Sequence, residues 1–318
     1  MNRFTLVLAL TACASAARAP MVLPADPVET IAASPAAGFW FPYILYLPNP
    51  AARETDLLVE PNNTGTTSDD FDVHLRAAVA TADGSTNSIG HFVAREVGLP
   101  LLVPAFPRPA ALPLTYTHAL DRDTMLLDRP PLRRLDLQLI AMIHDARRRL
   151  AERHIVVRER VLLTGFSASG AFANRFTFLH PDLVKGVAAG ALGVPLLPVA
   201  ELEGRTLDYP LGVHDHAALT GTSFPGATVK VIPQFIYVGE LDENDPVTSN
   251  DAFSEAERET IYAVLGKRKF PERWARCRQL YERTGMNATF KSYPGIGHGT
   301  NRAINLDIAA FFKALTRS

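Results

Sequence analysis

From about residue 40 onward, short apolar runs alternate with longer stretches in which apolar residues recur every three or four positions. The run 99–106 is almost continuously apolar, as expected for a strand buried on both faces, whereas 131–153 has one apolar helical face. Further strands are expected at 40–47, 56–59, 160–165, 231–238 and 288–292, and further helices at 87–97, 168–179, 255–265, 271–284 and 301–315. This alternation predicts an α/β fold with a mostly parallel central sheet and helices on both faces.

The composition fits one large globular domain and excludes several other classes of protein. Hydrophobic residues make up 47% of the 318 residues, which is enough to build a large core. The 32 lysines and arginines are balanced by 33 acidic residues, so we expect no nucleic-acid partner. Only two cysteines are present, which excludes a small disulfide-linked fold. The sequence also contains no glycine-rich nucleotide-binding motif, so we expect no cofactor.

The first residues have the layout of an export signal. Residues 1–19 combine Arg3, a short apolar stretch at 4–10 and a zone of small residues. Two processing sites compete, because Cys13 ends the apolar stretch in a sequence that resembles the bacterial lipobox, while 17–19 fits an ordinary A-x-A site. We favour a lipid anchor on Cys13, and therefore expect a periplasmic or membrane-anchored lipoprotein, or otherwise a secreted protein. Residues 20–36 are rich in alanine and proline and are interpreted as a flexible tether.

Residues 37–318 are then expected to form the folded domain, and 193–228 stands out within it. This segment is rich in proline, glycine and isolated histidines, so we interpret it as a lid-like insertion over the carboxyl edge of the sheet, where ligands bind in such folds. It contains His214, Asp215 and His216. Neighbouring side chains without a third ligand at a suitable spacing are weak grounds for a metal site, and we predict no metal.

A serine directly follows a buried predicted strand. Residues 161–170 read VLLTGFSASG, so the strand ends near Gly165 and a helix begins just beyond Ser167. A nucleophilic serine at such a sharp turn needs small residues two positions before and after it. Gly165 meets this requirement, and Ser169 is small although glycine is more usual there. Ser167 is the predicted nucleophile; the alternatives are Ser169 in that role and a merely structural, helix-capping Ser167.

A nucleophilic serine needs a base, and the base needs a carboxylate that orients it. When the serine occupies a strand-to-helix corner, the acid and then the histidine follow it along the chain. Asp242 comes shortly after the predicted strand 231–238 and is our candidate acid, with Asp245 and Glu240 as competitors. His298 stands between two glycines after the last predicted strand and is the candidate base.

The three strings GFSASG, GELDEND and YPGIGHG together resemble the α/β-hydrolase superfamily, especially secreted bacterial esterases of the polyhydroxyalkanoate-depolymerase and feruloyl-esterase type. The resemblance implies an α/β-hydrolase fold with Ser167 as nucleophile, Asp242 as acid and His298 as general base. The backbone N–H of Ala168, directly after the nucleophile, is the expected first oxyanion donor. The loop 60–65 departs from the His-Gly of many relatives; Asn63 is our candidate for the second donor, followed by Asn62.

These features predict a serine hydrolase that cleaves small or polymeric carboxylic esters outside the cytoplasm. His298 would take the proton of Ser167, backbone N–H groups would hold the oxyanion, and water would release the acyl-enzyme without any cofactor. Two alternatives stay open, because a fold does not fix a function. They are a peptidase of the same fold and a surface-anchored binding protein that has lost catalysis.

Overall fold

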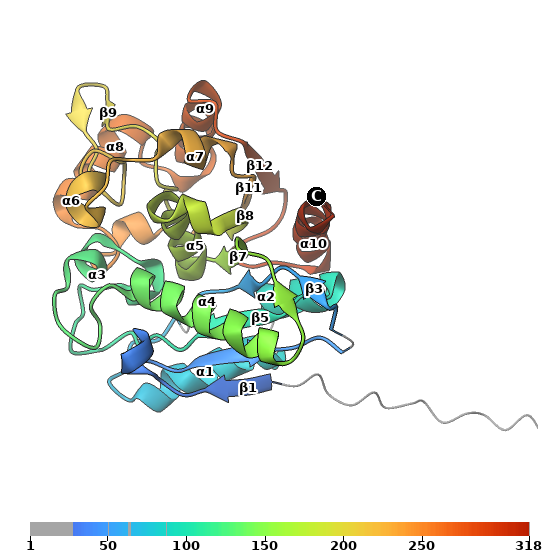
Figure 1. The fold of residues 1–318 in the computed structure, drawn as a ribbon. Coiled ribbons are helices and arrows are strands. Elements are labelled where there is room, and N and C mark those ends of the chain that lie inside the picture. Colours follow the sequence, from blue (N-terminus) through green and yellow to red (C-terminus); the bar gives the residue numbers. More distant parts are fainter. Residues whose placement is uncertain (1–27, 50, 63–64, 87, 318) are drawn as a thin grey trace, which may run out of the picture.

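The computed structural model describes residues 28–49, 51–62, 65–86 and 88–317, so the predicted signal sequence, Cys13 and Asn63 lie outside these ranges. An eight-stranded sheet runs through the molecule (Figure 1). In spatial order its strands are β1 (Val28–Ile31), β2 (Tyr43–Tyr46), β5 (Leu101–Pro104), β4 (Leu58–Val59), β7 (Val161–Phe166), β8 (Val184–Gly190), β11 (Gln234–Gly239) and β12 (Ala288–Tyr293). β2 pairs antiparallel with both of its neighbours, β1 and β5, and the strands from β5 to β12 in this order are parallel, as predicted.

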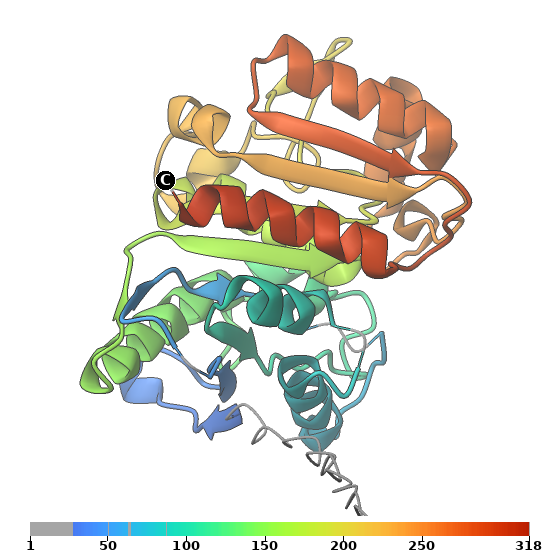
Figure 2. The same cartoon turned by 90° about the vertical axis from the view of Figure 1, so that its right-hand side faces the viewer.

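Helices cover both faces of this sheet (Figures 1 and 2). One face carries α1 (Phe71–Asp83), α2 (Ile89–Val97) and α10 (Arg302–Thr316), which share a single apolar cluster with the strands. The other face carries α4 (Leu135–Glu152), α5 (Ala168–Leu179), α8 (Glu255–Leu265) and α9 (Trp274–Arg283), which share a second, larger cluster. The central strand β7 is buried on both faces, which explains its unbroken apolar sequence.

Most predicted elements are present, with ends that differ by a few residues, but β8 and α1 were not predicted. β8 reads VKGVAAG, and its small residues give little hydrophobic signal. Two of these positions leave no room for a side chain: a Cβ on Gly186 would lie 2.4 Å from the Leu315 Cδ1 of α10, and a Cβ on Gly190 would lie 2.1 Å from the Tyr237 ring. The buried positions of α1 are likewise weakly apolar, since they include Ala78 and Ala82.

Part of the predicted tether is wrong, because residues 28–31 form β1. This strand pairs antiparallel with β2, and Ile31 is buried in the core. A short 3₁₀ helix, Pro35–Ala37, follows it. Pro35, the last proline of the predicted tether, begins this helix.

The segment expected as a lid-like insertion lies between β8 and β11. It contains a small hairpin, β9 (Glu201–Leu202) and β10 (Arg205–Thr206), and two short helices, α6 (His216–Thr220) and α7 (Gly226–Val231). Leu197, Leu207 and Tyr209 from this segment are buried in the larger apolar cluster. The insertion is therefore packed into the body of the domain over much of its length.

The remaining described elements are short. They are β3 (Glu54–Thr55), which pairs with β6 (Val156–Val157), the helix α3 (Arg122–Leu126), further 3₁₀ turns, and a π-helical turn, Lys269–Arg273, before α9. No helix among the described residues is long and apolar enough to span a membrane.

Candidate active site

Ser167 occupies the corner between β7 and α5. Its backbone has φ 58° and ψ −121°, a conformation that non-glycine residues rarely adopt and that strands and helices do not use. The corner is crowded, since a Cβ on Gly165 would lie 2.3 Å from the backbone oxygen of Ser169. The small residues flanking Ser167 are thus a steric requirement of the turn, as the sequence predicted.

Ser169 has a structural part in the same corner. Its hydroxyl accepts a hydrogen bond from the Phe166 N–H and donates one to the Phe166 carbonyl oxygen, both at 2.9 Å. The side chain is buried, so it braces the end of β7 against the first turn of α5. This arrangement favours Ser167 over Ser169 as the nucleophile.

Asp242 lies in the turn after β11 and accepts hydrogen bonds from the candidate base. Nδ1 of His298 is 3.0 Å from Oδ1 and 3.1 Å from Oδ2 of the carboxylate. The two competing acids have other partners: Asp245 pairs with the buried guanidinium of Arg273, and Glu240 accepts a hydrogen bond from the Ser292 hydroxyl. Of the three candidates, the structure brings only Asp242 to His298.

His298 lies on the loop between β12 and α10. This loop passes over the end of β11, where a Cβ on Gly239 would lie 2.3 Å from the Ile296 carbonyl oxygen. The imidazole packs against the Phe166 ring with 4.8 Å between ring centres. Because Nδ1 faces Asp242, Nε2 is the ring nitrogen left to exchange protons with a nucleophile.

Ser167 and His298 line the same cavity, which we call the Ser167 cavity. Its volume is about 570 Å³, and Ala168 also contributes to its wall. The backbone N–H of Ala168 lies at the start of α5, where helical N–H groups and the helix dipole favour an anion. Ala168 therefore suits the predicted role of oxyanion donor.

The second oxyanion donor stays a prediction, since Asn63 lies outside the described residues. The side chain of Asn62 is occupied elsewhere: Nδ2 donates to the Phe106 carbonyl oxygen at 2.9 Å, and Oδ1 accepts from the Phe106 N–H at 3.0 Å. These bonds tie the loop to the chain just after β5. Gly65, at the far end of this loop, lines the Ser167 cavity.

Lys269 is a member of the site that sequence reasoning missed. Its ammonium group donates to Asp242 Oδ2 at 2.7 Å and to the Asn244 carbonyl oxygen at 2.8 Å, and it is 7% exposed. Burial alone would raise the pKa of Asp242, but the hydrogen bonds and charges of His298 and Lys269 outweigh it, and the pKa lies below its usual value. Asp242 is therefore an anion whose charge is shared between an imidazole and a lysine.

The three insertion residues considered for a metal have separate partners. His214 contacts Asp208 at 2.7 Å, Asp215 pairs with Arg122 at 2.6 Å, and His216 contacts the Thr222 carbonyl oxygen at 3.0 Å. No group of three potential metal ligands occurs among the described residues. These contacts hold the insertion together. They explain why the three polar side chains are present without invoking a bound metal.

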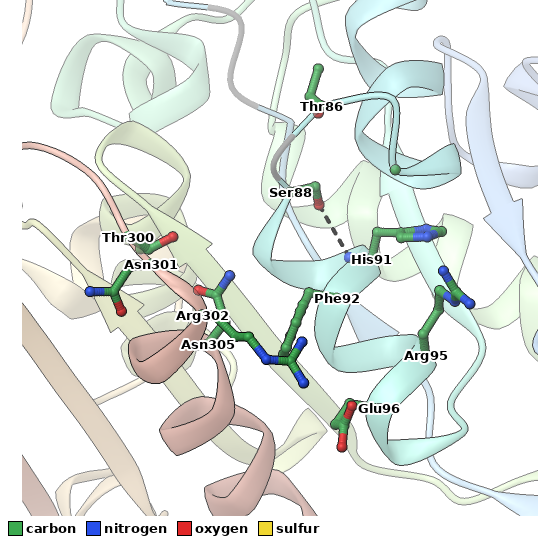
Figure 3. Close-up of a pocket in the computed structure, with 11 residues that line it drawn as sticks. Thr86, Ser88, His91, Phe92, Arg95, Glu96, Thr300, Asn301, Arg302 and Asn305 are labelled. Carbon is green, nitrogen blue, oxygen red and sulfur yellow. Dashed lines mark hydrogen bonds between the residues drawn. The ribbon is translucent and has the colours of Figure 1, made fainter.

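A second cavity, of about 670 Å³, lies between α2 and α10 (Figure 3). We call it the α2/α10 cavity. Ser88 and Asn301 from its wall cap the two helices, accepting hydrogen bonds from the N–H groups of His91 and Ile304. Arg302 lies over the Phe92 ring, 5.9 Å from its centre. Neither Ser167 nor His298 is part of this wall.

The strand order, the strained serine corner and the acid–histidine contact together define an α/β-hydrolase fold. No protein-family model matches the chain, and no curated protein matches it. Among solved structures it is similar to poly(aspartic acid) hydrolase-1 from Sphingomonas sp. KT-1, with a TM-score of 0.60 and 18% identity over 93% of this chain and 99% of the other.

Two further solved structures agree with this assignment. A poly(3-hydroxybutyrate) depolymerase from Bordetella parapertussis has a TM-score of 0.58 and 18% identity, covering 90% of this chain and 89% of the other. An arylesterase structure has a TM-score of 0.50 and 12% identity, covering 93% and 88%. At these identities the likeness establishes the fold, and the α/β-hydrolase architecture predicted from the motifs is confirmed.

Proposed function

We propose that this protein is a serine hydrolase that cleaves carboxylic esters. The observation that carries the proposal is the contact of His298 with the buried, ionised Asp242 at the cavity that also contains the strained Ser167. The names of the similar structures, which include a depolymerase of a polyester and an arylesterase, support ester hydrolysis.

The proposed reaction uses these residues in turn. His298 takes the hydroxyl proton of Ser167 through Nε2 as Ser167 attacks the ester carbonyl carbon, and Asp242 stabilises the resulting imidazolium. The N–H of Ala168 holds the oxyanion, and His298 returns its proton to the departing alcohol. Water, deprotonated by His298, then attacks the acyl-enzyme and releases the acid and free Ser167.

The test is hydrolysis of p-nitrophenyl acetate, butyrate and octanoate by the full chain and by Ser167→Ala. Removal of a serine nucleophile typically lowers kcat by about 10⁶-fold, so the variant should show only background turnover. Retained turnover in the variant would exclude this nucleophile. A folded wild-type protein that cleaves none of the esters would instead favour the peptidase or the inactive binding protein.

We also propose that the protein is exported, with Cys13 as its lipid attachment site. The layout of residues 1–19 supports this proposal. Incorporation of labelled palmitate by cells that express the wild-type chain, compared with Cys13→Ser, tests it. Label that is absent, or equal in both, would contradict lipidation, and the N-terminal sequence of the mature protein would then show whether cleavage follows Ala19.

A further inference from the structure

The wall of the Ser167 cavity contains a buried arginine that the proposed reaction does not use. Arg175 lies on α5, is 2% exposed and contributes to this wall. It donates one hydrogen bond, from Nη1 to the Ala119 carbonyl oxygen at 2.8 Å. Its Nε is buried and has no hydrogen-bond partner among the described residues. An unpartnered buried donor is costly, so such groups call for an explanation.

The charge of Arg175 is also uncompensated. No carboxylate of the described residues forms an ion pair with it, and its central carbon lies 5.6 Å from the centre of the Phe253 ring. Its charge does act on Asp121, but the Asp121 oxygens accept the backbone N–H groups of Tyr116 and Thr124 at 3.0 and 2.9 Å. A buried guanidinium of this kind is typically matched by an anion.

A second arginine completes this part of the wall. Arg108 is 8% exposed, stacks on the Tyr116 ring with its central carbon 3.6 Å from the ring centre, and pairs with Asp251. All three side chains line the Ser167 cavity. The cavity therefore contains two fixed guanidinium groups and one carboxylate, which leaves an excess of positive charge.

The distance between Ser167 and Arg175 limits the length of a ligand that could contact both residues. Ala168 and Arg175 are seven residues apart on α5, which corresponds to about 10 Å along the helix axis. Long side chains in helices lean toward the N-terminus, so we expect the guanidinium to lie several ångströms nearer to Ser167 than its Cα does. A chain of about four to six carbons spans such a gap.

We propose that the Ser167 cavity binds substrates whose acyl group carries a free carboxylate, and that Arg175 recognises this carboxylate with Arg108 beside it. The substrate class is then the monoesters of dicarboxylic acids or the acidic ends of a polymer. The proposal rests on the proposed ester hydrolysis. It gives the uncompensated charge a counter-ion, since guanidinium binds carboxylate in a planar, two-bonded geometry.

The first measurement compares two esters with wild-type protein. Mono-4-nitrophenyl adipate and 4-nitrophenyl hexanoate have the same leaving group and acyl chains of equal length, and only the former carries a terminal carboxylate. We expect kcat/KM for the adipate to exceed that for the hexanoate by about tenfold or more. Equal or faster cleavage of the hexanoate would overturn the proposal, while cleavage of neither ester would instead count against the proposed function.

Two substitutions should move this preference in opposite directions. Arg175→Gln should lower the adipate-to-hexanoate ratio about ten- to hundredfold, and Asp251→Asn should raise it, because it removes the negative charge beside Arg108. Arg205→Gln, on the exposed strand β10, is the matched control and should leave the ratio unchanged. Equal losses on both esters in Arg175→Gln would assign Arg175 a structural role; if that variant does not fold, the Asp251→Asn result still decides.

Discussion

The Ser167 cavity and the α2/α10 cavity are similar in volume, about 570 and 670 Å³, yet their polar groups are used differently. In the α2/α10 cavity, Ser88 and Asn301 cap helices, and the His91 Nδ1 contacts the Ala82 carbonyl oxygen at 2.7 Å. In the Ser167 cavity, by contrast, a strained serine, an accessible imidazole and an uncompensated arginine converge. Cavity volume alone therefore does not identify the active site. The polar groups of the cavity wall that are not used to hold the fold together identify it.

The largest effect outside Ser167 itself is expected from Asp242→Asn. The amide cannot stabilise the imidazolium and favours the wrong histidine tautomer, so kcat should fall about 10⁴-fold. Ester kinetics at neutral pH measures this loss. Glu240→Gln removes an acid from the same turn that contacts Ser292 instead, and it should lose less than about tenfold. Similar losses in both variants would mean that Asp242 has no special role.

Glu60 should give the next largest effect, on stability. Burial raises its pKa to about 7, against opposing hydrogen bonds from the Ser88 hydroxyl and the Gly90 N–H. The folded protein then binds a proton that the unfolded chain releases near pH 4.5, so the free energy of unfolding falls as pH rises through this window. The expected loss is about 3 kcal/mol between pH 4.5 and 7.

Urea denaturation of wild type and Glu60→Gln over this pH range tests the prediction. Glutamine stays neutral, so the difference in unfolding free energy between the two proteins should change with pH in the variant's favour as pH rises. Burial also raises the pKa of Asp121, to about 6. Asp121 contributes equally to both proteins, so its effect cancels in the difference. A pH-independent difference would show that Glu60 is ionised in the folded state throughout.

Lys269→Met should alter the pH profile of catalysis. Lys269 helps to hold the pKa of Asp242 below its usual value, so without the ammonium group Asp242 should take up a proton at a higher pH. The acid limb of kcat/KM against pH should therefore move to higher pH. Lys267→Met, an exposed lysine two residues away, is the control. A uniform loss of activity without movement of the limb would reduce Lys269 to a packing role.

The smallest effect is expected from Ser88→Ala in the α2/α10 cavity. Loss of the helix cap should lower the free energy of unfolding by about 1 kcal/mol, whereas kcat/KM should stay within about twofold of wild type. Thermal denaturation and ester kinetics measure the two quantities, with the exposed Ser85→Ala as control. A large loss of activity at unchanged stability would contradict the assignment of a structural role to the α2/α10 cavity and of a catalytic role to the Ser167 cavity alone.

The parts of the site predicted from the sequence are those fixed by local steric rules and chain order. Ser167 was recognisable because a sharp turn demands small neighbours, and Asp242 and His298 because they follow strands that end at the same edge. Lys269 and Arg175 were not recognisable. Lys269 is brought to Asp242 by a turn 27 residues away, and Arg175 has the sequence context of an ordinary helical arginine, because its burial and its unpartnered Nε arise only from tertiary packing.

The fold shows the same division. Apolar strands such as β5 and β7 were predicted, whereas β8 was missed because close contacts with Leu315 and Tyr237 demand glycine at two of its positions. The tether was wrong at 28–31 because pairing with β2, a long-range contact, turns a short polar-apolar segment into a strand. Local sequence patterns thus predict elements that have a clear hydrophobic pattern of their own. They miss elements that form because of contacts with neighbouring elements.

The proposed function depends above all on Ser167 being an activated nucleophile. Treatment of the full chain with a fluorophosphonate, followed by intact-mass and peptide mass spectrometry, tests this most directly. We predict a single adduct on Ser167, formed much more slowly in His298→Gln. No adduct on the folded protein, or an adduct on Ser169 instead, would contradict it.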